Sequence, residues 1–138
     1  MERLVNLEST HWLWKILFVL QLSATLMDLH RMSIESVILQ PSHPFFVSIL
    51  VFVFDQLVLF ANYCVIANKF YLNRAAWLLT LIMSPVSVVL VLYFEFTAGG
   101  YSSSDMMAYG LGTFWLLVLF LLPLFKLIKD FERRKIAD

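Results

Sequence analysis

The sequence predicts an all-α integral membrane protein, a four-helix bundle that forms a single domain over residues 1–138. Of its residues, 61% are hydrophobic and only 14% are charged, whereas soluble domains average about 45–50% apolar and about 25% charged residues. Four apolar runs are each roughly 20 residues long, the length at which an α-helix crosses a bilayer. These predicted spans cover residues 12–32, 44–67, 75–96 and 106–128.

Residues typical of helix starts and of loops separate the four predicted spans. Ser9 and Thr10 precede the first span, Asn73 precedes the third, and Asp105 comes directly before the fourth. These residue types are favoured at helix N-caps because their side chains accept hydrogen bonds from free backbone N–H groups. The sequence Ala-Gly-Gly-Tyr at 98–101 is expected to end the third helix.

The basic residues predict the orientation of the spans. Among the ten lysines and arginines, Arg31 alone lies at the end of the first span that leads to the second. The other nine lie near the N-terminus, between the second and third spans, or in the C-terminal tail. Positively charged loops stay in the cytoplasm, so both termini are expected there. Trp12, Trp14 and Trp77 would form an aromatic belt at this interface. The membrane would be the endoplasmic reticulum in a eukaryote or the cell inner membrane in a bacterium.

The same composition argues against several classes of function. A formal net charge of zero gives no sign of a nucleic-acid partner. A single cysteine, Cys64, excludes an internal disulfide and paired-cysteine redox chemistry. Three histidines without metal-ligand spacing do not predict a zinc site. We therefore expect no metal and no cofactor.

Polar residues inside the predicted spans are the most informative about function. Gln21 and Asp28 are seven residues apart, as are Asp55 and Asn62, and this spacing returns to nearly the same helix face. An Asp at the centre of a span costs roughly 2.5–3.5 kcal/mol on insertion scales. Asp28 and Asp55 are therefore expected to face each other across a polar pocket. For Gln21, Gln56 and Asn62 the favoured alternative is hydrogen bonding that only holds helices together.

Further residues suggest how such a pocket is built. Pro85 interrupts the hydrogen bonding of the third span near its middle, and kinks of this kind open space inside a bundle. Gln21 and Gln56 are kept as candidate ligand-binding residues beside the two acids. The candidate walls are Phe52, Tyr93, Tyr109 and Trp115.

The order of these features resembles the EXPERA-domain family, which includes the sigma-two receptor and the emopamil-binding sterol isomerase. The resemblance extends over residues 12–135. The matching segments are ATLMDL at 24–29, FVFDQL at 52–57, Ser84-Pro85, FEF at 94–96 and AYG at 108–110.

The resemblance implies a cavity that accepts amphiphilic amines and sterols. Residues at the places of Asp28 and Asp55 would line it, with a tyrosine at the place of Tyr109. This chain departs from the family at two positions. It has Asp55 where receptor-like members have Glu, and Val51 where isomerase-like members have His, which weakens the enzyme interpretation.

We therefore expect an intramembrane pocket that binds a hydrophobic, sterol-like or amphiphilic amine ligand through Asp28 and Asp55. An ammonium ion is attracted to buried carboxylates and to aromatic faces. The alternatives are a sterol double-bond isomerase, a small proton-coupled exporter, and a non-enzymatic membrane partner of the immunity type. The apolar surface leaves room for a homodimer, although no motif specifies one.

Overall fold

The computed structural model describes residues 2–34 and 44–137, and all of their regular structure is helical. The helices are α1 (Glu2–Ile34), α2 (Phe45–Ala67), α3 (Arg74–Ala98) and α4 (Ser103–Ala137). Each of the four is long and apolar enough to cross a membrane. The predictions of an all-α fold and of four membrane-length apolar helices are confirmed.

Two helices extend well beyond the apolar runs that predicted them. The helix α1 already begins at Glu2, so Ser9 and Thr10 lie inside it and the prediction that they cap it is wrong. Residues 2–11 contain no Gly or Pro that would break the helix. At the other end of the chain, α4 continues through the basic segment to Ala137. Hydropathy marks where lipid contact ends, whereas the helix ends only where its hydrogen bonding stops.

Two side-chain caps and one backbone cap define three of the other helix ends. Asn73 Oδ1 accepts a hydrogen bond from the Ala76 backbone N–H at 2.9 Å and starts α3, as predicted. The Ser102 hydroxyl accepts from the Asp105 N–H at 3.2 Å, while Asp105 accepts in return from the Ser102 N–H at 3.3 Å. This reciprocal pair is a capping box at the start of α4. Asn68 ends α2 in the left-handed conformation, with φ 53°.

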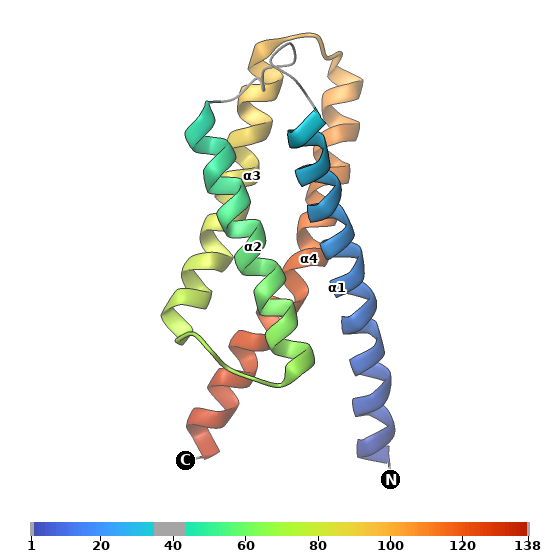
Figure 1. Ribbon diagram of the computed structural model, residues 1–138, viewed down its shortest axis with the longest axis vertical. Coiled ribbons are helices and arrows are strands. Elements are labelled where there is room, and N and C mark those ends of the chain that lie inside the picture. Colours follow the sequence, from blue (N-terminus) through green and yellow to red (C-terminus); the bar gives the residue numbers. More distant parts are fainter. Residues whose placement is uncertain (1, 35–43, 138) are drawn as a thin grey trace.

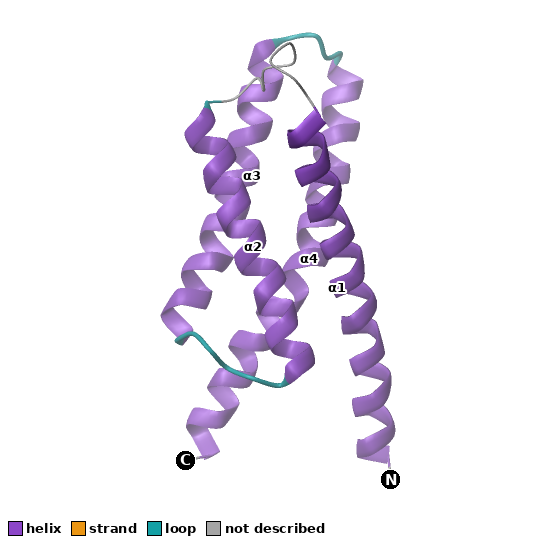
Figure 2. Cartoon of the chain, in the orientation of Figure 1, coloured by secondary structure: helices purple, strands orange, loops and turns teal. Residues whose placement is uncertain are grey.

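The four helices run alternately up and down, and both termini lie at the same end of the molecule (Figures 1 and 2). The helix α2 packs against all three others, whereas α1 touches α4 only slightly. We call the end that carries the termini the terminal end, and the other the loop end. A glycine pair connects α3 to α4 at the loop end, where Gly99 and Gly100 adopt φ values of 88° and 93° that other residues rarely reach.

The tightest packing lies between α2, α3 and α4 in the terminal half. A cluster of buried residues is centred on Trp77, which has 0% of its surface exposed and packs beside Phe60 with ring centroids 6.1 Å apart. The expectation that Trp77 belongs to an interfacial belt is therefore wrong, because its ring points into the bundle. The other members of the cluster are Val58, Ala61, Cys64, Leu121, Leu124 and Leu127.

Contacts that the α2–α3 connection and the first residue of α3 make with α4 hold the terminal end together. Arg74 forms a salt bridge with Glu132, and Phe70 meets Phe131 edge to face with ring centroids 4.6 Å apart. Both partners of the salt bridge are about half exposed, and exposed ion pairs contribute only about 0–1 kcal/mol. The aromatic contact and the buried cluster therefore stabilise this end more than the ion pair does.

Replacing Trp77 by Ala should lower the free energy of unfolding by about 3–5 kcal/mol, since the substitution leaves a large cavity in the cluster. The matched control is Trp115→Ala, because Trp115 is 67% exposed and exposed substitutions change stability by about 0.5 kcal/mol or less. Unfolding in mixed detergent, followed by circular dichroism, measures both variants. Equal losses in the two variants would contradict the packing described here.

Candidate functional site

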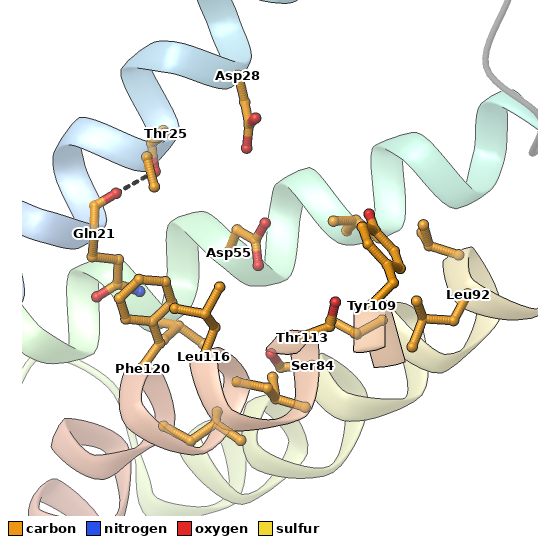
Figure 3. A pocket seen from close by; sticks show the side chains of 17 residues that line it. Gln21, Thr25, Asp28, Asp55, Ser84, Leu92, Tyr109, Thr113, Leu116 and Phe120 are labelled. Atoms are coloured by element: carbon orange, nitrogen blue, oxygen red, sulfur yellow. Dashed lines mark hydrogen bonds between the residues drawn. The ribbon is translucent and has the colours of Figure 1, made fainter. Parts of the chain in front are cut away.

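A cavity of about 350 Å³ lies in the loop half of the bundle, and all four helices contribute to its wall (Figure 3). Its size falls near the lower end of the range for small-molecule sites, about 300–1,000 Å³. Most of the lining is aliphatic. The 17 lining residues are Gln21, Ala24, Thr25, Asp28, Val51, Asp55, Val58, Ser84, Val88, Val91, Leu92, Tyr109, Thr113, Leu116, Leu117, Phe120 and Leu121.

The two acidic residues singled out in the sequence both line this cavity. Asp28 comes from the loop-end part of α1 and Asp55 from the middle of α2. Figure 3 shows both carboxylates directed into the same space between the helices. Asp55 is partly buried, whereas Asp28 is exposed at the edge of the cavity. The cavity therefore concentrates negative charge within apolar walls, where electrostatic interactions are stronger than in water.

Gln21 adds an unpaired polar group to the cavity wall. Only 5% of its surface is exposed, and its Oε1 atom has no hydrogen-bond partner in the described part of the chain. The Thr25 hydroxyl donates instead to the Gln21 backbone carbonyl at 3.1 Å. A buried polar atom without a partner costs about 1–3 kcal/mol, so this oxygen is suited to accept a hydrogen bond from a bound molecule.

Gln56 and Asn62 are expected to form hydrogen bonds between helices, but the buried Nε2 atom of Gln56 and the amide atoms of Asn62 form none among the described residues. Gln56 lies outside the cavity lining, and its Nε2 atom has no partner among the described residues. Asn62 is completely buried, and neither its Oδ1 nor its Nδ2 atom is paired. Holding the helices together is therefore not the role that the structure gives to these atoms.

Three of the four candidate aromatic walls lie outside the lining. Tyr109 lines the cavity, whereas Phe52, Tyr93 and Trp115 are exposed on the outer surface of the bundle. Each helix residue turns by about 100° relative to its neighbour, so a side chain at the right depth can still point outward. The apolar part of the lining consists instead of small and medium aliphatic side chains, together with Phe120.

The helix α3 contributes a polar group beside its internal proline. Ser84, directly before Pro85, is almost fully buried and lines the cavity. Thr80 and Ser87 satisfy their hydroxyls within α3, donating to the carbonyls of Ala76 at 2.9 Å and Ser84 at 2.7 Å. The serine hydroxyl next to the proline is the polar group that this helix presents to the cavity.

An aromatic cluster borders the cavity at the loop end. Tyr109 packs against Phe96 and Tyr101, with ring centroids 6.2 and 6.3 Å away. The Tyr101 hydroxyl donates a hydrogen bond to Glu95 at 2.9 Å. This hydrogen bond, together with the negative charge of Glu95, raises the pKa of Tyr101 above its ordinary value of 10.0. The contact fixes the α3–α4 connection over the loop-end side of the cavity.

Among the described residues, no group of three or more His, Cys, Asp or Glu side chains is arranged to hold a metal ion. The chemistry that the site offers comes from two carboxylates, a carboxamide, hydroxyls and an aliphatic wall. Such groups bind and orient a ligand by charge and hydrogen bonding.

Replacing Glu95 by Ala should return the pKa of Tyr101 toward 10, because the variant loses both the hydrogen bond and the neighbouring charge. Since the folded-state pKa is raised, the stabilisation from this contact is present at neutral pH and is lost as the pH rises through that raised pKa. Ultraviolet titration of tyrosinate, with Tyr101→Phe identifying the signal, measures the shift. An unchanged Tyr101 midpoint in Glu95→Ala would contradict the assignment.

Comparison of the chain with models of protein families found no match. Comparison with characterised proteins found no match either, and no solved structure matches the chain.

Proposed function

We propose that this chain is a multi-pass membrane protein whose central cavity binds a hydrophobic molecule carrying a positive charge, an amphiphilic amine or a sterol-like amine. The observation that carries the proposal is the presence of Asp28 and Asp55 in one cavity of about 350 Å³ with mostly aliphatic walls. A ligand with an ammonium group and an apolar skeleton complements both features.

The charge of the cavity supports a cationic ligand over a neutral one. Two carboxylates that line one cavity repel each other, and the partly buried Asp55 also loses hydration. An ammonium ion placed between Asp28 and Asp55 compensates both effects at once. The unpaired Oε1 atom of Gln21 offers a further acceptor for an N–H or O–H donor on the same ligand.

The wall of the cavity favours binding over catalysis. Val51 lines the cavity one helical turn before Asp55, at the position where the resemblance to isomerase-like EXPERA proteins implies a histidine. The ligand class proposed here agrees with the one that this resemblance implies. Sterol isomerisation stays the enzymatic alternative, since a carboxylic acid can also donate a proton to an alkene.

The proposal includes the orientation of the protein and the membrane in which it lies. The terminal end carries Arg74, Lys126 and Lys129, so we place this end, with both termini, in the cytoplasm. The membrane is the endoplasmic reticulum in a eukaryotic cell or the inner membrane in a bacterium. The amphiphilic ligand would then enter from the lipid or from the loop end.

Asp55→Asn should weaken binding of a fluorescent long-chain tertiary amine by about 10- to 100-fold, because a charge-assisted hydrogen bond contributes about 1.5–3 kcal/mol. Asp28→Asn should weaken it in the same direction. The measurement is fluorescence titration of the purified protein in lipid nanodiscs. Asp130→Asn is the matched control, since Asp130 pairs with Lys126 outside the cavity and its loss should leave affinity unchanged.

A neutral alcohol with the same skeleton separates charge recognition from simple partition into the cavity. It should bind the wild type and Asp55→Asn with equal affinity. Undiminished amine binding by a folded Asp55→Asn protein would refute the proposal. A loss of stability in both acidic variants without any amine binding by the wild type would instead favour a structural membrane partner.

A further inference from the structure

Buried polar atoms without partners continue beyond the cavity toward the terminal end of the bundle. The indole Nε1 of Trp14 and both side-chain amide atoms of Asn62 are buried and find no partner within residues 2–34 and 44–137. Neither residue lines the cavity, whose deepest polar members on these two helices are Gln21 and Asp55. The binding site described above therefore leaves these groups unexplained.

The four residues form a regular pattern along the two helices. Trp14 lies seven residues before Gln21 on α1, and Asn62 lies seven residues after Asp55 on α2. Since α1 and α2 run in opposite directions (Figure 1), both steps lead from the cavity toward the terminal end. Seven residues make two helical turns and advance by about 10 Å on nearly the same face. We call this strip, from Gln21 and Asp55 to Trp14 and Asn62, the α1–α2 seam.

Asn62 is the group that most needs a partner in the seam. None of its surface is exposed, and its carboxamide has two donor hydrogens and an acceptor oxygen that the protein leaves unused. Its neighbour one turn back, Val58, lines the cavity together with Gln21. Water is the smallest molecule that pairs with both donors and acceptors, and buried waters typically make about three hydrogen bonds.

The helix α4 has a backbone acceptor without its usual donor next to the cavity lining. Pro123 is fully buried inside α4 and has no N–H, so the Leu119 carbonyl lacks its usual helical donor. Phe120 and Leu121 line the cavity beside Val58. Asn62 lies one turn after Val58 on α2, and Pro123 lies about one turn after Phe120 on α4. The helices α2 and α4 run in the same direction (Figure 1).

We propose that the α1–α2 seam holds a narrow column of ordered water that connects the cavity to the terminal end and lets Asp55 exchange protons with the solution there. The column passes the apolar side chains of Leu17 and Val58, which lie between its polar groups on the same helix faces. The titratable groups that share the cavity with Asp55 are Asp28 on α1 and Tyr109 on α4; α3 contributes only the Ser84 hydroxyl and apolar groups.

This inference goes beyond the proposed ligand and does not depend on it. Even if the cavity bound no ligand, the buried polar atoms of Asn62 and Trp14 would still need hydrogen-bond partners. Conversely, an amine-binding cavity with a dry seam would exchange protons only through its loop-end side. The two proposals can therefore fail separately.

Substituted-cysteine labelling tests the seam directly. Cys64 is the chain's single cysteine and is replaced by Ala in the background. A membrane-impermeant methanethiosulfonate reacts with a thiolate, which forms only where water is present. In proteoliposomes, Asn62→Cys should react with reagent added on the side of the termini at least tenfold faster than the matched control Tyr63→Cys. Tyr63 is the next residue on α2 and is 43% exposed on the outer surface.

Two results of this labelling would overturn the proposal. One is reactivity of Asn62→Cys as low as that of Tyr63→Cys, which would mean that the seam is dry. The other is modification only by reagent on the loop-end side, which would mean that water reaches Asn62 through the cavity alone.

A measurement on the unmodified chain covers the case in which Asn62→Cys does not fold. Solid-state nuclear magnetic resonance in bilayers detects transfer of magnetisation from water to side-chain N–H groups. We expect transfer to the Asn62 amide and the Trp14 indole, and loss of the Trp14 transfer in Asn62→Leu but not in the control Gln56→Leu. Absence of transfer to Asn62 in the wild type would contradict the water column.

Discussion

The cost of placing two carboxylates inside an apolar helix bundle is the constraint on which the rest of the structure depends. Asp28 and Asp55 could not face acyl chains without a large loss of hydration. Both residues instead line one cavity to which all four helices contribute. Every other polar feature of the site, from the Gln21 carboxamide to the Ser84 hydroxyl, faces that space as well.

Packing density divides the molecule into two halves with different tasks. In the terminal half, Trp77 and the leucines of α4 form a buried cluster that holds α2, α3 and α4 together. In the loop half, aliphatic side chains of moderate size leave a cavity open. The helix α1 packs mainly on α2 and forms the side of the cavity that carries Asp28. A rigid half thus supports a half with room for a ligand.

Sequence patterns predicted the helices and the acidic pair for clear physical reasons. Apolar runs of membrane length and Asn73 as a cap are local features, and the seven-residue spacings predicted that Gln21 and Asp28 share a face. The aromatic walls were not predictable in the same way. The sequence positions of Tyr93 and Trp115 do not give the direction of their side chains, because this direction depends on the rotation of each helix, which is set by packing with the other helices. The unpaired state of Asn62 likewise becomes visible only once its neighbours are placed.

The most direct test of this account is an experimental structure of the protein in a lipid bilayer with a tertiary amine bound. We expect the amine nitrogen between the carboxylates of Asp28 and Asp55, and its apolar part against the apolar wall formed by Val88, Leu116 and Phe120. An amine held on the outer surface of the bundle, with leucine and phenylalanine side chains filling the space between the two carboxylates, would contradict the central claim.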